Sequence, residues 1–116
     1  MKFVIHYHDT KTAHYDLMVE HGDSLLTWQI DKSDIENLLV GKKITCRKIQ
    51  DHRKKYLDYE GPISCDRGRV NIYDSGEYSN INWREENKEL IVNGAILKGK
   101  LRITKSKDPE YFLEVY

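Results

Sequence analysis

Apolar and polar residues alternate along most of the 116-residue chain with the period of two that is typical of β-strands. In His14–Glu20, for example, Tyr15, Leu17 and Val19 should point to one face of a sheet and the intervening residues to the other. This alternation predicts a mainly β domain. The predicted strands are Phe3–His8, His14–Glu20, Ser24–Gln29, Lys43–Gln50, Arg69–Tyr73, Glu77–Trp83, Glu89–Val92, Ala95–Thr104 and Tyr111–Val115.

Two local signals interrupt the strand pattern. Asn93-Gly94 lies between two apolar runs and predicts a hairpin with a type I′ turn, because that turn needs positive φ at both central positions. Ser33–Val40 is the one predicted helix, since Ser33 and Glu36 have capping-box spacing. Many short antiparallel strands with one short helix predict a small closed or nearly closed antiparallel β-barrel, formed as a single domain by residues 1–116.

Composition narrows the class of protein. Nineteen basic and nineteen acidic residues cancel, which argues against bulk-charge coating of nucleic acid. Two basic runs, Lys42–Lys55 and Lys98–Lys107, suit a phosphate groove, although solvated strand faces are the simpler interpretation. No apolar stretch suggests a signal peptide or a membrane span, and Cys46 and Cys65 lack CxxC spacing. We therefore expect a monomeric cytoplasmic protein with free thiols and no membrane partner.

Histidine and aspartate residues concentrate near the start of the chain, in YHDTKTAHYD (7–16). His14 and Asp16 are two positions apart on one predicted strand, so their side chains should lie side by side. His8 ends the preceding strand, and the residues between have hairpin length, so His8 is placed to add a third ligand. Two histidines and a carboxylate suit Mn²⁺, Fe²⁺ or Zn²⁺. For each residue taken alone, a surface histidine or an Asx turn is the alternative.

A second polar cluster spans Gln50–Tyr56. His52 is followed there by three consecutive cations, which disfavour its protonation unless an anion such as phosphate binds nearby. A solvated turn is the alternative. His6 and His21 lack comparable neighbours in the sequence, so we expect them to be surface residues.

The order of these motifs resembles the 3′-phosphoesterase module of bacterial DNA ligase D. The segments that carry the resemblance are FVIHYHDTKTAHYDLMVE (3–20), LLTWQI with Trp28, QDHRKKYLDYEG (50–61), VNIYDSGEY (70–78) and LKGKLRI (97–103). It implies a β-barrel enzyme that uses a divalent metal, preferably Mn²⁺ with Zn²⁺ or another ion as alternatives. Such an enzyme removes a 3′-terminal ribonucleoside or 3′-phosphate from DNA primer-template 3′ ends. A free-standing form would work with a separate DNA ligase or polymerase.

By position, the resemblance implies that His8, His14 and Asp16 are metal ligands, and that His52 and Tyr56 are catalytic residues at the scissile phosphate.

The sequence departs from the family pattern at groups that contact phosphate. Met18 stands where the family has arginine, Gln50 where it has glutamate, and the glycine-rich segment is reduced to Ile63–Gly68. Restoring arginine at position 18 is therefore expected to raise activity. These departures keep a second hypothesis open, a non-catalytic metal- or DNA-end-binding barrel descended from the family. The expected substitute phosphate- or DNA-binding residues are Lys11, Arg53 and Arg69.

Overall fold

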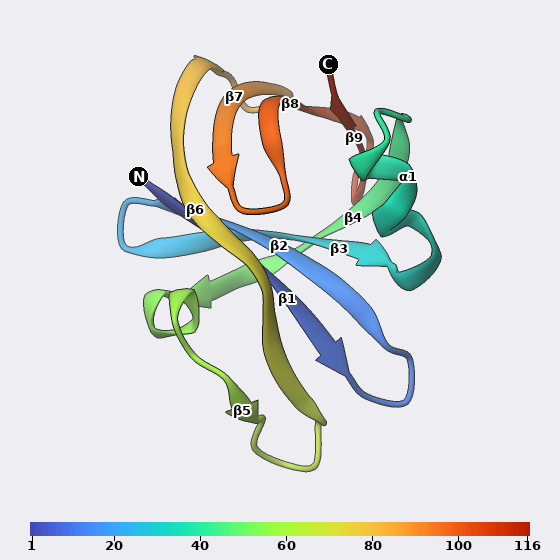
Figure 1. Ribbon diagram of the computed structural model, residues 1–116, viewed down its shortest axis with the longest axis vertical. Coiled ribbons are helices and arrows are strands. Elements are labelled where there is room, and N and C mark those ends of the chain that lie inside the picture. The colour runs from blue at the N-terminus through green and yellow to red at the C-terminus, as the bar shows by residue number, and fades with distance from the viewer.

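The alternating segments form nine strands, joined mostly by short turns, in the computed structural model, which describes all 116 residues (Figure 1). The elements in chain order are β1 (Lys2–Asp9), β2 (His14–His21), β3 (Ser24–Asp31), the 3₁₀ turn η1 (Lys32–Asp34), α1 (Ile35–Leu39), β4 (Ile44–Arg53), the 3₁₀ turn η2 (Lys54–Leu57), β5 (Gly61–Pro62), β6 (Arg69–Trp83), β7 (Asn87–Gly94), β8 (Lys98–Lys107) and β9 (Glu110–Val115).

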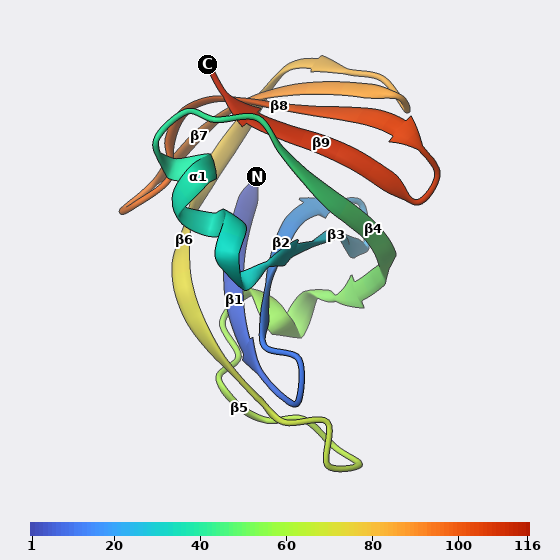
Figure 2. The ribbon, with the colours of Figure 1, turned by 90° about the vertical axis from the view of Figure 1, so that its right-hand side faces the viewer.

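Eight of these strands close a barrel. Hydrogen bonds link them in the order β1-β2-β3-β4-β9-β8-β7-β6, and β6 returns to β1, with every pair antiparallel. Two perpendicular views show this curled sheet, with α1 beside β4 and β9 and the two-residue β5 outside the ring (Figures 1 and 2). The predicted antiparallel β-barrel with one short helix is confirmed.

Strand β6 closes the ring, and it is longer than the sequence predicts. It runs for 15 residues through Asp74-Ser75-Gly76, where the pattern indicates a gap between two strands. The first part of β6 pairs with β1 and the last part with β7. A register shift opposite Ile5 and His6 leaves Tyr73 as a bulge. Because a bulge bends and twists a strand, one strand can serve both neighbours.

The β7–β8 hairpin forms, but its turn is not the predicted one. The Gly94 amide donates to the Leu97 carbonyl over 2.9 Å, which makes Ala95 and Ile96 the central residues. The Asp74 carboxylate, at 3% exposure, accepts hydrogen bonds from the amides of Ala95, Ile96 and Leu97. Gly94 is required for space, because a Cβ there would lie 2.4 Å from Oδ2 of Asp74. The type I′ prediction at Asn93-Gly94 is therefore wrong.

The helix is shorter and less regular than predicted. Ser33–Val40 contains part of η1 and then five α-helical residues, and neither segment has a side-chain cap, so the expected capping box does not form. Buried Ile35 and Leu38 hold α1 against the barrel instead. No helix in the structure has the length and apolar character needed to cross a membrane. Both cysteines are free, and burial raises the pKa of the Cys46 thiol to about 12.

Side chains fill the barrel interior, so the barrel is not a ligand cavity. Its core includes Phe3, Trp28 and Leu101, each at 1% exposure or less. A separate, smaller cluster of Val4, Met18 and Leu25 lies on the other face of β1–β3, under Tyr56 and Leu57 of η2. Residues 54–68, which we call the covering segment, thus lie over part of the outer face of the sheet.

Candidate metal and phosphate site

The β1–β2 hairpin brings the three predicted metal ligands together. His8 lies directly opposite His14 across the two strands, and Asp16 is two residues farther along on the same face. One ligand atom from each residue lies within 4.8 Å of the others. Asp16 Oδ1 is 3.3 Å from His14 Nε2, and Asp16 Oδ2 is 3.9 Å from His8 Nδ1. We call these residues the ligand trio.

Main-chain carbonyls fix the orientation of both histidine rings. His8 Nε2 donates to the Arg67 carbonyl over 2.6 Å, and His14 Nδ1 donates to the Thr12 carbonyl over 2.9 Å. A carbonyl oxygen can only accept, so these nitrogens carry protons and the other two ring nitrogens face Asp16. Metal-binding histidines in proteins are usually oriented by such a second hydrogen bond.

Asp16 shows that the ligand trio fits a cation. The residue has 4% exposure, and its Oδ1 has no hydrogen-bond partner. Burial of an unpaired carboxylate is costly, and a bound divalent ion would compensate for it. Without an ion, the adjacent Asp16 carboxylate raises the pKa of His14, because a proton on Nε2 then takes the place of a cation.

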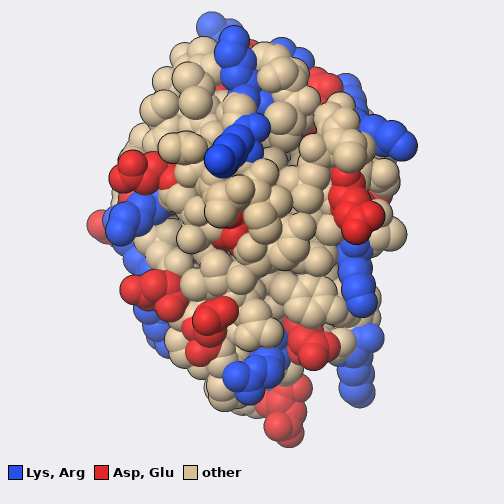
Figure 3. Space-filling view, viewed as in Figure 1, with Lys and Arg blue, Asp and Glu red and all other residues tan.

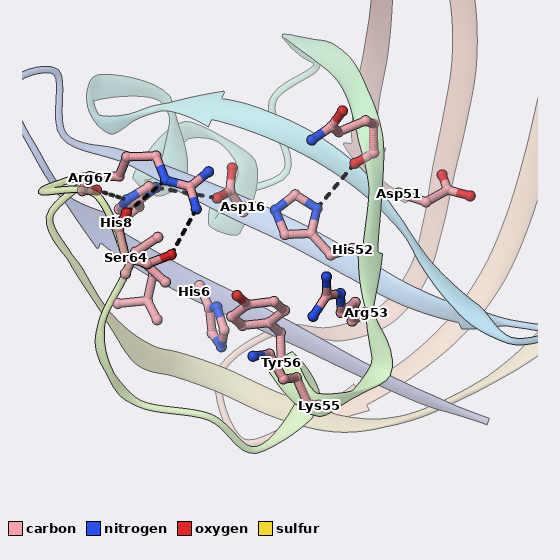
Figure 4. Close-up of a pocket in the computed structure, with 13 residues that line it drawn as sticks. His6, His8, Asp16, Asp51, His52, Arg53, Lys55, Tyr56, Ser64 and Arg67 are labelled. Carbon is pink, nitrogen blue, oxygen red and sulfur yellow. Dashed lines mark hydrogen bonds and ion pairs between the residues drawn. The ribbon is translucent and has the colours of Figure 1, made fainter.

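A cavity of about 320 Å³ lies next to the ligand trio, between the sheet and the covering segment (Figure 4). Ten of its 13 lining residues are not hydrophobic, and these ten come from β1, β2, β4 and the covering segment. The polar residues that matter below are His6, His8, Asp16, His52, Arg53, Lys55, Tyr56, Ser64 and Arg67. The cavity is thus suited to a polar ligand rather than to an apolar one.

Both predicted catalytic residues line this cavity. His52 lies in β4, and its Nδ1 is 3.0 Å from Oγ1 of Thr27 and 3.1 Å from the Gln50 carbonyl. The Thr27 hydroxyl donates to the Leu25 carbonyl, so its oxygen accepts from His52, and Nε2 stays free. Figure 4 shows this second nitrogen on the side of Asp16. The Tyr56 ring stands edge-on to His52, with 5.9 Å between centroids.

His6 lies in the cavity wall, so the prediction of a surface residue is wrong. It has 2% exposure, it pairs across the strands with Asp16, and its Nε2 has no hydrogen-bond partner. Burial lowers the pKa of His6. Because His6 lies two residues before His8, strand alternation places both on the same face. The covering segment that buries His6 is distant in sequence, so its burial could not be predicted locally. His21 is exposed, as predicted, and stacks on Trp83.

Only one of the three predicted phosphate-binding cations lies at the cavity. Arg53 lines the cavity, whereas Lys11 and Arg69 are exposed outside its lining. Arg67, which sequence reasoning missed, also lines it. Of the two basic runs, Lys98–Lys107 lies on β8 and contributes nothing to the cavity. On the face shown in Figure 3, acidic and basic side chains are interspersed, as expected for a solvated surface.

The burial of Met18 argues against the expected gain of activity from an arginine at this position. Met18 has 0% exposure and packs with Val4 and Leu25 under Tyr56 and Leu57. Met18→Arg is therefore expected to lower the free energy of unfolding by about 3–5 kcal/mol, because it buries an unpaired guanidinium. Urea unfolding followed by circular dichroism measures this loss.

The matched control is Met18→Leu, which conserves volume and should cost less than about 1.5 kcal/mol. If Met18→Arg were as stable as the wild type and more active, the covering segment would have to admit the guanidinium, and the inference from burial would be wrong.

The fold and the site together define a small β-barrel domain with a candidate metal centre and a polar cavity on its outer face. Residues 6–105 match the profile of the DNA Ligase D 3′-phosphoesterase domain, and the chain belongs to this family.

Curated relatives agree with this assignment. The chain is 29% identical over 111 residues to the multifunctional non-homologous end joining protein LigD of Mycobacterium bovis, which is 90% of this chain and 14% of that protein. The same values relate it to the multifunctional non-homologous end joining DNA repair protein LigD of Mycobacterium tuberculosis. It is 24% identical over 125 residues to the LigD protein of Pseudomonas aeruginosa, covering 97% of this chain and 15% of that protein. The chain therefore spans only a small part of these relatives.

Proposed function

We propose that this domain is a metal-dependent phosphoesterase that processes the 3′ ends of DNA primer-templates during end joining. It would remove a 3′-terminal ribonucleoside, a 3′-phosphate or both, and leave a 3′-hydroxyl for repair synthesis and ligation. A DNA ligase or polymerase would use this product. The family supports the hydrolase class, and the names of the relatives support the end-joining context.

One observation carries the proposal: His8 and Asp16 of the ligand trio line the same polar cavity as His52 and Tyr56, and His14 lies beside them. These side chains come from β1, β2, β4 and η2, so only the folded barrel brings them together. A cation and a nearby histidine with a free ring nitrogen are the components needed to hold a phosphoester and move a proton at one of its oxygens.

His8, His14 and Asp16 would hold the metal ion through His8 Nδ1, His14 Nε2 and the Asp16 carboxylate. When bound, the ion supplies Lewis-acid polarisation of a phosphate oxygen. Two imidazoles and one carboxylate suit Mn²⁺, which we propose as the physiological ion, and also Zn²⁺.

His52 and Tyr56 would act at the phosphate itself. Thr27 and the Gln50 carbonyl hold His52 Nδ1, so its free Nε2 is oriented to donate to, or accept from, an oxygen of the phosphate. The Tyr56 hydroxyl adds a neutral donor. The chain's own residues thus orient the phosphate and move the proton at the leaving oxygen.

The test uses a primer-template whose primer ends in one ribonucleotide, incubated with and without Mn²⁺. Electrophoresis separates primers ending in a 3′-phosphate from those ending in a 3′-hydroxyl. We expect Mn²⁺-dependent shortening, and His52→Ala should lower its rate by about 100-fold or more, the usual contribution of a positioned acid or base.

Retention of Mn²⁺ without any product would favour instead the non-catalytic metal- or DNA-end-binding barrel. Full activity of His52→Ala would remove His52 from the mechanism.

A further inference from the structure

Arg67 is linked directly to the ligand trio by its main chain. Its carbonyl oxygen accepts the 2.6 Å hydrogen bond from His8 Nε2, so the residue that orients a metal ligand also carries a guanidinium into the cavity lining (Figure 4). The loop around it is closed by a 2.8 Å hydrogen bond from the Ile63 amide to the Gly68 carbonyl.

Ser64 orients the Arg67 side chain before any ligand arrives. Arg67 Nε donates to the Ser64 carbonyl over 2.9 Å, and Nη2 lies 3.3 Å from Ser64 Oγ. The remaining N–H groups of the guanidinium have no protein acceptor, and no carboxylate forms an ion pair with it. A fixed, uncompensated guanidinium has the donor geometry that matches phosphate oxygens.

The other cations of the cavity lack this arrangement. Arg53 makes no side-chain hydrogen bond or ion pair that would orient it. Lys55 lies over the rings of Tyr56 and Tyr59, with its Nζ 5.1 and 5.9 Å from the centroids. Since a preorganised group loses less entropy on binding, Arg67 is the cation best prepared to hold an anion here.

His6 gives a second indication that the cavity takes a polar ligand. Its buried Nε2 has no partner in the protein, and a buried polar atom left unpaired is unfavourable. A ligand oxygen would satisfy this nitrogen. Position 18, where the family has arginine, is a buried methionine beneath the covering segment. It therefore supplies no cation to the cavity.

We propose that Arg67, oriented by Ser64, is the phosphate-binding residue of this cavity and holds the non-bridging oxygens of the 3′-terminal phosphate beside the ligand trio. This proposal rests on the proposed function, because it assigns a role within the same site. It makes Arg67 a substrate-binding residue, whereas its carbonyl acts as a positioning group for His8.

The test measures phosphate binding separately from catalysis. Inorganic phosphate is titrated into the metal-free 116-residue chain, and amide chemical shifts of residues 63–68 are followed by NMR. Arg67→Gln is expected to weaken phosphate binding about tenfold, the effect of losing one charge-assisted contact. Arg67→Lys should recover only part of this loss, because lysine keeps the charge and loses the planar fork.

Three further measurements separate binding from structure. Arg84→Gln removes an exposed arginine in the β6–β7 turn and should leave phosphate binding unchanged. Mn²⁺ affinity, measured by electron paramagnetic resonance, should be unchanged in Arg67→Gln, because the Arg67 carbonyl that holds His8 is retained. On a primer with a 3′-phosphate, KM should rise about tenfold in Arg67→Gln.

Phosphate binding by Arg67→Gln at wild-type affinity would overturn the proposal. An equal loss of Mn²⁺ affinity would also overturn it, by showing that Arg67 acts only on the structure of the loop. If the wild type binds phosphate through Arg67 and yet cleaves no primer, the phosphate site stands and the proposed enzymatic function fails.

Discussion

His14→Ala is expected to lower Mn²⁺-dependent cleavage by at least about 100-fold, because the variant loses one of three metal ligands. His14 Nε2 lies 3.3 Å from the unpaired Asp16 Oδ1, so the substitution removes one of the three ligand atoms that lie within 4.8 Å of one another. Electron paramagnetic resonance should show a matching loss of bound Mn²⁺. The free energy of unfolding should change by about 1 kcal/mol or less, since His14 is outside the barrel core.

The control for this variant is His21→Ala, which removes an exposed histidine at the other end of β2. Its activity and Mn²⁺ affinity should match those of the wild type. Normal cleavage and normal Mn²⁺ binding by His14→Ala would show that the ligand trio is not the metal site.

Asp74→Ala is expected to lower the free energy of unfolding by about 3–5 kcal/mol. The Asp74 carboxylate accepts hydrogen bonds from the backbone amides of Ser75, Ala95, Ile96 and Leu97, and alanine would remove the acceptor of all four. Each unsatisfied buried donor costs about 1–3 kcal/mol, and relaxation of the turn recovers part of the total. Urea unfolding followed by circular dichroism measures the change.

Asp23→Ala serves as the matched control, because Asp23 is exposed in the β2–β3 turn and should change stability by less than about 0.5 kcal/mol. If Asp74→Ala unfolded at the wild-type urea concentration, water would be able to replace the carboxylate, and the turn would not depend on it.

The sequence predicts those parts of the molecule that depend on neighbours in the chain. The ligand trio is one example, because a single hairpin sets the spacing of His8, His14 and Asp16 and strand alternation sets their common face. The barrel is another, since most of its strands pair with the next strand along the chain.

Features that depend on distant residues were missed. Asp74 lies 21 residues from Ala95, so the hairpin turn that it fixes is not visible in the local Asn93-Gly94 pattern. His6 is buried by residues that follow it by about 50 positions in the chain, and Arg67 reaches His8 across 59 positions. In both cases, a tertiary contact overrides a local signal.

The cavity lies outside the filled barrel, so the residues that pack the interior are separate from those that line the cavity. Substitutions or changes of length in the covering segment alter the cavity wall, while Trp28 and Leu101 remain packed in the interior. The barrel can therefore serve as a constant scaffold, while residues 54–68 both form part of the cavity wall and cover a small apolar cluster. A graft of residues 54–68 between members of the family would therefore have to keep the packing of Tyr56 and Leu57 on the buried Val4, Met18 and Leu25 cluster.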